Sequence, residues 1–283
     1  MSGICGFFSV IPNKHLLAQF NKTMEQNVRG EYKSVSGDFF KFINVESSQN
    51  ENKELHKENC TQLQIITHGE AYNENAVNLD ETILDLYKND ELARLQDFNG
   101  SFLAAIYDEK KCKAVLVNDR FGTVKTYYHY NSGTLYFTPK IKLLLQLGAP
   151  KSLRMESIYD FFLFGYPLGD KTLFKDIFQL PPASIVEMTE HGLKFTKYWD
   201  VNWYSEYDSR PVHELVDELY ILWQQAVERR VDRKNNNLIF LSGGLDSRAI
   251  LAASLKSIDK EKLHTVTYGH ERSLDFKLGR LIA

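Results

Sequence analysis

The sequence is poor in cysteine, and it has no long hydrophobic run. Its three cysteines, Cys5, Cys60 and Cys112, are scattered along 283 residues, and no spacing of Cys and His is typical of a zinc site. An odd number of scattered cysteines favours a reducing compartment, so we expect a cytoplasmic protein. No apolar stretch approaches the roughly 20 residues of a membrane span. The first ten residues lack the basic region and cleavage pattern of an export signal.

An excess of charge of one sign is also missing. Lys and Arg number 34 and Asp and Glu number 37, which gives a formal net charge of -3. This balance gives no electrostatic reason to expect nucleic acid or an anionic membrane as a partner. Hydrophobic residues at 43% and charged residues at 25% are ordinary for a globular protein. The length allows one large domain or two ordinary ones.

The first two hundred residues contain many short strand patterns and few helical ones. Helical patterns cover residues 14–26, 81–87 and 91–95, and the polar stretch 46–59 predicts a surface loop. Strands are predicted at residues 3–10, 36–45, 62–68, 101–108, 113–118, 126–130 and 133–138. This pattern favours packed antiparallel sheets flanked by helices.

The composition changes near residue 200. Residues 200–210 are polar and aromatic without an apolar period, which predicts a linker, and Pro211 suits the first turn of a helix. Apolar residues then recur at helical spacing, at Val216, Leu219, Tyr220, Trp223, Val227 and Val231. Strand and helix patterns alternate after them, at residues 238–241, 245–256, 264–268 and 273–283. This order predicts the start of a doubly wound parallel sheet.

The turn after the first of these strands carries the strongest chemical signal. An apolar run ends in Ser242, Gly243 and Gly244, and Asp246 and Ser247 open the helical stretch. Bare backbone N–H groups at the positive end of a helix hold phosphate, and glycines allow positive φ and close backbone approach. The two hydroxyls add donors, and the carboxylate can hold magnesium against phosphates. The turn is not a Walker loop, because it lacks the GxxxxGKS/T pattern. A tight turn without a ligand is the plain alternative.

Several segments resemble known families. The turn resembles the SGGxDS pyrophosphate loop of the N-type ATP pyrophosphatases, which cleave ATP to AMP and pyrophosphate. Other segments resemble the glutamine-hydrolysing asparagine synthetases, namely SGICG at 2–6, VRG at 28–30, HGEAYN at 68–73, NGSF at 99–102, IYD at 106–108, DRFG at 119–122, TYY at 126–128, LFKDI at 173–177 and LPP at 180–182. Each short piece alone is weak evidence, whereas DRFG and SGGLDS in that order are specific together.

The resemblance implies a fold and a domain order. Residues 1–200 would form an α+β sandwich of the N-terminal-nucleophile type, with αββα layers and a glutamine amidotransferase-like site. Residues 201–212 would form a linker, and residues 213–283 the start of an α/β ATP-pyrophosphatase doubly wound domain. In the family this domain continues with a second magnesium aspartate and a lysine that stabilises adenylation. We therefore expect the chain to be truncated or to be completed by another chain.

Several key positions depart from the family pattern. A glutaminase of this type needs a cysteine thiolate directly after Met1, with its own α-amino group as base, but the residue is Ser2. The oxyanion-hole asparagine falls at His68, although Gly69 keeps the backbone donor, and the acid that grips the glutamine amino group falls at Asn99. Losing one oxyanion donor costs about 2.7–4 kcal/mol in a comparable site. We therefore predict an inactive glutaminase.

Some residues of the glutamine pocket are retained, and two alternative assignments of the nucleophile are open. Arg29, which would pair with the substrate carboxylate, is retained, as is Glu70. Cys5 would be the nucleophile if residues 1–4 were removed, although it also fits a small buried hydrophobe on the first strand. Ser2 would alternatively act as an N-terminal nucleophile on another amide.

Carried over to the second domain, the resemblance implies an ATP and Mg²⁺ site. The implied ATP-binding positions are Leu241, Ser242, Gly243, Gly244, Asp246, Ser247, Val266, Tyr268 and Gly269. Asp246 would be a magnesium ligand. Leu241 and Val266 also fit ordinary core strand positions. Asp275 would either approach magnesium or cap its helix.

The function expected from the resemblance is ATP-dependent formation of an amide bond. The substrate would be a small-molecule or peptide carboxylate, adenylated with release of pyrophosphate. The lost nucleophile favours relatives that close lactam rings in small metabolites or in lasso peptides. A glutamine- or ammonia-dependent asparagine synthetase and a non-catalytic, partner-dependent scaffold are the alternatives. No nucleic-acid or membrane partner is expected, and a homodimer is left open.

Overall fold

The computed structural model describes residues 2–28, 32–45, 63–72, 78–201, 203 and 208–283. The chain divides into two compact units, Met1–Asn202 and Trp203–Ala283, here called the N-terminal and C-terminal units and described separately. Within the described ranges, no helix has both the length and the apolar character needed to cross a membrane.

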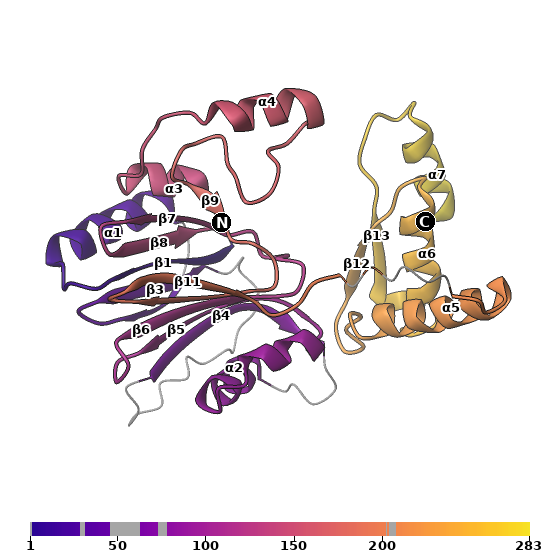
Figure 1. Cartoon of the computed structure of the whole chain (residues 1–283). Coiled ribbons are helices and arrows are strands. Elements are labelled where there is room, and N and C mark those ends of the chain that lie inside the picture. Colours follow the sequence, from indigo (N-terminus) through magenta and orange to yellow (C-terminus); the bar gives the residue numbers. More distant parts are fainter. Residues whose placement is uncertain (1, 29–31, 46–62, 73–77, 202, 204–207) are drawn as a thin grey trace. The chain divides into compact units, whose positions relative to one another are not determined.

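Two antiparallel sheets form the middle of the N-terminal unit (Figure 1). The six-stranded sheet contains, in spatial order, β2 (Tyr32–Ser36), β3 (Phe40–Val45), β1 (Gly3–Ser9), β8 (Thr134–Thr138), β7 (Tyr127–Asn131) and β9 (Phe178–Gln179). The five-stranded sheet contains β11 (Gly192–Lys197), β10 (Ser184–Thr189), β6 (Lys113–Asn118), β5 (Gly100–Asp108) and β4 (Leu63–Ala71). Strand β1 lies inside the first sheet and β4 at the edge of the second.

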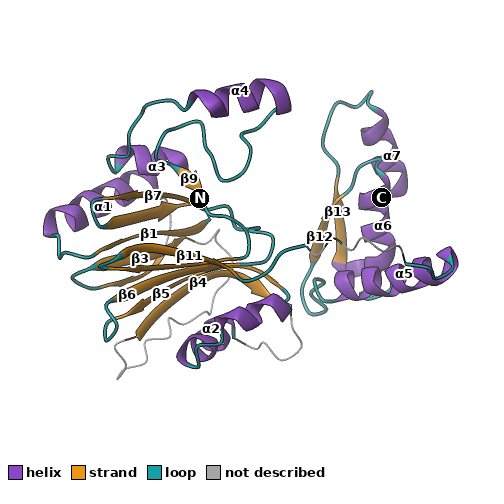
Figure 2. Cartoon of the chain, in the orientation of Figure 1, coloured by secondary structure: helices purple, strands orange, loops and turns teal. Residues whose placement is uncertain are grey.

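Helices cover the outer faces of both sheets (Figure 2). Helix α1 (Lys14–Asn27), whose N-terminus is capped by Asn13, packs with α3 (Ile141–Gln146) on the six-stranded sheet. Helix α2 (Leu79–Lys88) and the 3₁₀ helix η1 (Leu92–Asp97) pack on the five-stranded sheet. The layers therefore follow the order αββα, and the predicted sandwich is confirmed.

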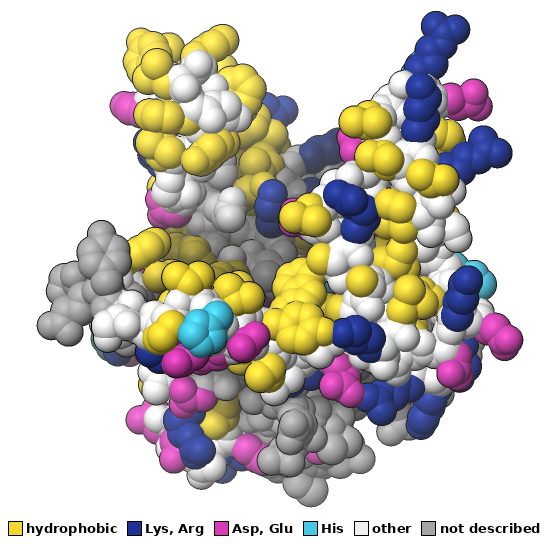
Figure 3. All heavy atoms as spheres, turned by 90° about the vertical axis from the view of Figure 1, so that its right-hand side faces the viewer, with side chains coloured by type: hydrophobic (Ala, Val, Ile, Leu, Met, Phe, Trp, Pro, Cys, Tyr) yellow, Lys and Arg dark blue, Asp and Glu magenta, His cyan; other side chains and the backbone are white. Residues whose placement is uncertain are grey.

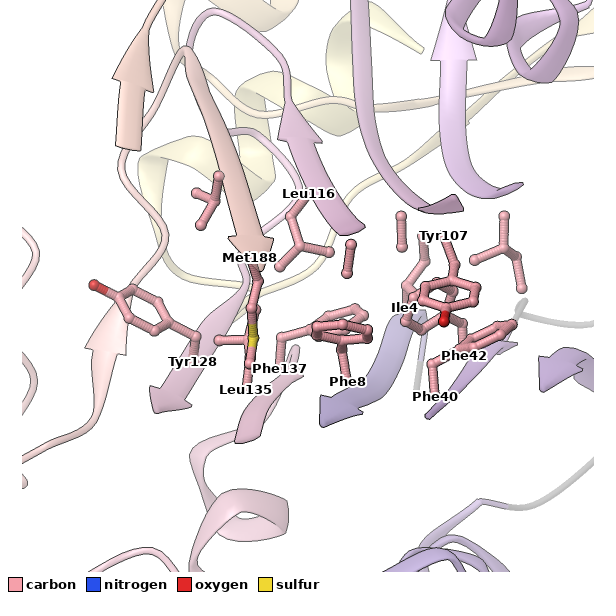
Figure 4. Close-up of a cluster of buried hydrophobic side chains, with 14 of the residues drawn as sticks. Ile4, Phe8, Phe40, Phe42, Tyr107, Leu116, Tyr128, Leu135, Phe137 and Met188 are labelled. Carbon is pink, nitrogen blue, oxygen red and sulfur yellow. The ribbon is translucent and has the colours of Figure 1, made fainter. Parts of the chain in front are cut away.

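The core between the sheets is rich in aromatic side chains (Figure 4). Phe8 and Phe40 from the six-stranded sheet meet Tyr107 from the five-stranded sheet, and the Phe40 and Tyr107 rings stack with centroids 4.2 Å apart. A Cβ atom at Gly6 would lie 2.6 Å from the Phe137 ring, so only glycine fits there. Full burial of one such aromatic side chain contributes about 1.5–3 kcal/mol, so this layer holds the sheets together.

Some elements differ from the sequence prediction. The strand expected at 36–45 begins later, as β3 at Phe40, after a turn in which Gly37 N donates to Phe40 O, and β2 before that turn was not predicted. The helix expected at 91–95 is the 3₁₀ helix η1. Strands β10 and β11 and helices α3 and α4 (Met155–Phe164) were not predicted. Helix α4 has exposed aromatic residues without an apolar stripe that faces a core, so periodicity gives it no clear signal. The loop expected at 46–59 lies outside the described residues.

The C-terminal unit alternates helices and strands. It contains α5 (Val212–Glu228), β12 (Asn237–Phe240), α6 (Leu245–Ser254), the 3₁₀ helix η2 (Lys260–Lys262), β13 (Leu263–Val266) and α7 (Leu274–Ile282). Strands β12 and β13 pair in parallel, with Asn237 opposite Leu263 and Phe240 opposite Val266. A parallel pair joined through a helix is the start of a doubly wound sheet, as predicted.

Much of the apolar surface of this unit is exposed. Of the apolar positions expected along α5, Val227 is buried, whereas Leu219 is 65% exposed and Val216 and Tyr220 are exposed as well. Hydrophobic side chains gather in several places on the face shown in Figure 3. The helical spacing thus predicted the helix correctly, but it did not predict which residues are buried in this chain. Pro211 is the N-cap of α5, one position before the expected one.

Candidate functional site

Ser2 is brought next to His68, although 66 positions separate them in the sequence. Ser2 directly precedes β1, whose seven residues are all buried, while Ser2 itself is exposed. His68 comes from β4 of the other sheet. The Ser2 Oγ and His68 Nε2 atoms lie 3.0 Å apart, at hydrogen-bond distance. The fold therefore places a ring nitrogen of His68 beside the hydroxyl of Ser2, the predicted nucleophile position.

Asn44 continues this contact on the other side of the imidazole ring. It is a buried residue on β3, directly opposite Ile4 of β1. Its Oδ1 lies 2.9 Å from His68 Nδ1, and its Nδ2 donates to the Thr67 backbone oxygen at 2.8 Å. The sequence analysis missed Asn44. The one available signal was a polar residue inside the apolar strand FKFINV.

The remaining positions of the expected glutamine pocket differ in their exposure to solvent and in their contacts. Gly69 has φ +112°, and a Cβ there would lie 2.0 Å from the Ser101 backbone oxygen, so β4 and β5 require glycine at this position. Glu70 is exposed, and by the period-two alternation of a strand it lies on the same face as His68. Asn99 is half-buried, and its backbone oxygen accepts from Tyr72 N at 2.7 Å. Arg29 lies outside the described residues.

Cys5 is placed away from solvent. It is fully buried on the outer side of β1, among Phe7, Phe20 and Leu143. Burial raises the pKa of the Cys5 thiol to about 12, and a buried neutral thiol is a poor nucleophile. The environment of Cys5 is therefore that of a small core side chain.

We predict that Cys5 resists alkylation in the folded chain. In a Cys60→Ser background, iodoacetamide at mildly alkaline pH should modify Cys112, because this free cysteine is exposed and the reagent can reach it. Cys5 should stay unmodified until denaturant unfolds the chain, since its raised pKa keeps the thiol protonated. Peptide mass spectrometry before and after unfolding measures both sites. Rapid modification of Cys5 in the native chain would contradict this assignment.

The DRFG segment begins with a buried hydrogen-bond acceptor. Asp119 is 2% exposed, and its carboxylate accepts from the backbone N–H groups of Phe102, Phe121 and Thr123. Thr123 Oγ1 also donates to it at 2.6 Å. These contacts fix the turn after β6 against β5. Asp119, the first residue of the DRFG segment, therefore has a structural role.

In the C-terminal unit, the predicted phosphate loop leads from β12 into α6. Leu241 is buried, and its N–H donates to Val266 O at 2.9 Å. The Ser242 N–H donates to Ser247 Oγ at 3.1 Å, and the Gly244 N–H donates to Ser242 Oγ at 3.1 Å. The two predicted hydroxyls therefore lie together inside the loop, at the N-terminus of α6.

Neither loop glycine has positive φ, and one of the two is required by the close approach of another element. Gly244 has φ -67°, and Gly243 is not among the glycines with positive φ, so neither residue uses the positive φ that glycine allows. A Cβ at Gly243 would instead lie 2.9 Å from Asp275 Oδ1 and 3.0 Å from Asp275 Cα. Close approach of α7 to the loop explains the glycine at this position.

Asp275 lies beside the loop and does not cap its helix. Ser273 is the N-cap of α7, with its side chain accepting from Phe276 N at 3.2 Å, so the capping alternative for Asp275 is wrong.

Strand β13 ends at Val266, two residues earlier than predicted. Tyr268 is therefore outside the strand and 80% exposed, and Gly269 follows with φ +137°.

Two carboxylates, Asp246 and Asp275, are available for a metal ion at the loop. Among the described residues, no group of three or more His, Cys, Asp or Glu could hold a metal ion. Magnesium commonly binds one or two carboxylates together with water and substrate phosphates. Asp246, in the first turn of α6, and Asp275 are exposed carboxylates of that kind. Arg248, which the sequence analysis did not single out, donates through Nε to Gly244 O at 3.2 Å and adds a cation at the loop.

Two family models match successive parts of the chain. A glutamine amidotransferase domain model matches residues 75–199, and an asparagine synthase model matches residues 218–283. The chain is 26% identical over 230 residues to a putative glutamine-hydrolysing asparagine synthetase 2 of Methanocaldococcus jannaschii, covering 75% of this chain and 44% of that protein. It is 28% identical over 228 residues to glutamine-hydrolysing asparagine synthetase 3 of Bacillus subtilis, covering 74% and 37%.

A plant protein extends the match along the chain. Glutamine-hydrolysing asparagine synthetase 3 of Arabidopsis thaliana is 24% identical over 251 residues, which is 81% of this chain and 38% of that protein. The chain thus spans less than half the length of each of these relatives. The amidotransferase match comes first and contains the DRFG segment, and the synthase match follows it and contains SGGLDS. Over both matches, the chain is similar to the asparagine synthetase family.

Proposed function

We propose that the C-terminal unit binds ATP with Mg²⁺ and serves the formation of an amide bond. A carboxylate would be activated by adenylation, pyrophosphate would leave, and an amine would then displace AMP. The observation that carries this proposal is the turn from Ser242 to Ser247, where hydroxyls and backbone N–H groups converge at the N-terminus of α6. An anion at this point gains from both the hydrogen bonds and the helix dipole.

The loop residues would share the work of holding pyrophosphate. Ser242 and Ser247 Oγ, which lie 3.1 Å apart, would exchange their mutual contact for phosphate oxygens. Asp246 and Asp275 would hold the metal, which supplies charge neutralisation on the leaving pyrophosphate. Leu241, Val266, Tyr268 and Gly269 would border the nucleoside, with the exposed Tyr268 ring the largest surface available to it.

We also propose that the amine is not released from glutamine by this chain. A hydroxyl at position 2 is a much weaker nucleophile than a thiolate, the buried Cys5 thiol is protonated, and Asn99 lacks the charge that would pair with the glutamine amino group. This favours a lactam- or macrolactam-forming synthetase with a small-molecule or peptide carboxylate. Asparagine synthesis from free ammonia is the second candidate, favoured by the names of the relatives.

Calorimetric titration of the chain with ATP and Mg²⁺ tests the loop. We expect saturable binding that a Ser242→Ala, Ser247→Ala double variant weakens about 100-fold or more, because each of the two lost hydrogen bonds to a charged group contributes about 1.5–3 kcal/mol. Ser257→Ala, beyond the end of α6, is the matched control and should bind as the parent does. Absence of ATP binding by the folded parent chain would favour the scaffold alternative and contradict the proposal.

A measurement of glutamate release tests whether this chain hydrolyses glutamine. Incubated with glutamine, the chain should release glutamate no faster than its Ser2→Ala variant. Release well above that control would show that the amidotransferase site hydrolyses glutamine, and the ammonia would then originate in this chain.

A further inference from the structure

Three polar side chains form a continuous relay at one end of the sandwich. Ser2 and Asn44 come from the six-stranded sheet and His68 from the five-stranded sheet. The Ser2 Oγ to His68 Nε2 distance is 3.0 Å, and the His68 Nδ1 to Asn44 Oδ1 distance is 2.9 Å. The buried end of the relay is Asn44, and the accessible end is Ser2. A nucleophile, a base and an orienting group thus occur in the order that acyl transfer requires.

The contact of Asn44 with Thr67 determines where the imidazole proton lies. The Thr67 backbone oxygen only accepts, so the Asn44 atom 2.8 Å from it must be Nδ2. The other amide atom, Oδ1, therefore faces His68 Nδ1 and only accepts, so Nδ1 must carry a proton. In the neutral ring Nε2 is then unprotonated and accepts from the Ser2 hydroxyl. The ring is held as the tautomer of a general base.

We propose that Ser2, His68 and Asn44 form a hydrolytic relay that cleaves a carboxylic ester or an amide other than glutamine, whose amino group would find no carboxylate partner at Asn99. Ser2 Oγ bonds to the acyl carbon while its proton passes to His68 Nε2. The bond to the alcohol or amine then breaks, and the leaving group takes the proton from Nε2. Water attacks the acyl-serine, gives one proton to Nε2, and the serine leaves with that proton as the acid product departs. This activity is separate from the proposed ATP chemistry.

The relay differs from an N-terminal-nucleophile mechanism in its base. There, the α-amino group of the first residue accepts the nucleophile's proton, whereas here the imidazole lies at hydrogen-bond distance from the hydroxyl. The relay therefore needs no free amino group on Ser2. An exposed hydroxyl–imidazole contact contributes little to folding, so the chemistry and the stability of the N-terminal unit can be measured separately.

Diisopropyl fluorophosphate, which phosphorylates activated serines with loss of fluoride, tests the relay in the full chain. We expect an adduct on the peptide that contains Ser2, and none in Ser2→Ala. His68→Gln should slow labelling about 100-fold or more, because a positioned base contributes about 10²- to 10⁴-fold. Ser36→Ala, an exposed serine at the end of β2, is the control and should label as the parent does. All variants should keep the thermal melting curve of the parent.

Hydrolysis of p-nitrophenyl acetate gives the matching turnover measurement. Ser2→Ala should remove the rate above buffer, and His68→Gln should reduce it in parallel with labelling. No adduct on the folded parent, an adduct at another residue alone, or a folded His68→Gln variant that labels at the parental rate would each overturn the proposal.

Asn44 is a positioning residue, and its two contacts can be separated. Asn44→Asp keeps an acceptor for His68 Nδ1 but loses the donor to Thr67, whereas Asn44→Ala loses both. If Asn44 acts by orienting the ring, the aspartate should retain labelling and the alanine should lower it about tenfold or more, as expected when the orienting group of a triad is lost. Equal loss in both folded variants would reduce Asn44 to a structural tie and overturn its place in the relay.

A chain extended at its N-terminus distinguishes the two bases. With several residues preceding Met1, Ser2 has no free amino group, yet the contact to His68 needs none. Labelling should therefore persist in the extended chain. Loss of labelling there, with parental labelling of His68→Gln, would assign the base to the α-amino group and overturn the role of the imidazole.

Discussion

Replacing Asp119 with alanine is expected to lower the free energy of unfolding of the N-terminal unit by about 3–5 kcal/mol. Three backbone N–H groups lose their acceptor, the buried one of Phe102 and the partly buried ones of Phe121 and Thr123, and a buried donor left unsatisfied costs about 1–3 kcal/mol. The Thr123 hydroxyl loses its contact with the carboxylate as well and keeps the one with Ser101 Oγ. Because the carboxylate is 2% exposed, water can replace it only if the turn opens.

Chemical denaturation of the full chain measures this effect, with tryptophan fluorescence and circular dichroism followed together. Asp85→Ala, which changes an exposed aspartate on α2, is the matched control and should alter stability by less than about 0.5 kcal/mol. Asp119→Asn should fall between the two, because its amide keeps one acceptor oxygen and places an NH₂ group against backbone donors. A folded Asp119→Ala variant with control-like stability would show that the DRFG aspartate is not a structural acceptor.

The sandwich could be predicted from the sequence because its strands have clear hydrophobic patterns. Strand β6 was predicted with the bounds Lys113–Asn118 that the structure has, since its apolar run is enclosed by charged and polar residues. Strand β11 was missed because most of its residues are exposed and its apolar and polar alternation covers only the four residues 193–196. Where burial is weak, the local signal is weak, and pairing with β10 decides the structure.

The candidate sites also differ in how far apart their residues lie in the sequence, and this decided which of them could be predicted. The loop from Ser242 to Ser247 was found as a whole because strand, turn and helix are contiguous in the sequence. Ser2 and His68 were found separately, as departures from a family pattern, and nothing in the sequence predicted their contact. Asn44 was missed because its meaning depends on register, which places it opposite Ile4 and against Thr67 of the other sheet.

The C-terminal loop should respond very differently to a methyl group at its two glycines. Gly243→Ala is expected to weaken ATP binding about tenfold or more, because the added Cβ would lie 2.9 Å from Asp275 Oδ1, 3.0 Å from Asp275 Cα and 3.1 Å from Leu278 Cδ1. Overpacking of this kind costs about 1–3 kcal/mol. Helix α7 and the loop must move apart to relieve it, which also separates Asp246 from Asp275, the two proposed metal ligands.

Gly244→Ala is the matched control one residue later. Its φ of -67° suits any residue, and its Cβ would meet a single side-chain atom, Ser242 Oγ, at 3.1 Å. A serine hydroxyl can rotate away, so Gly244→Ala should bind ATP within a few-fold of the parent, by calorimetry in the presence of Mg²⁺. If both variants lose affinity equally while remaining folded, direct approach of phosphate to both glycines explains the loop. If only Gly243→Ala loses affinity, the contact of α7 with the loop is what holds the site together.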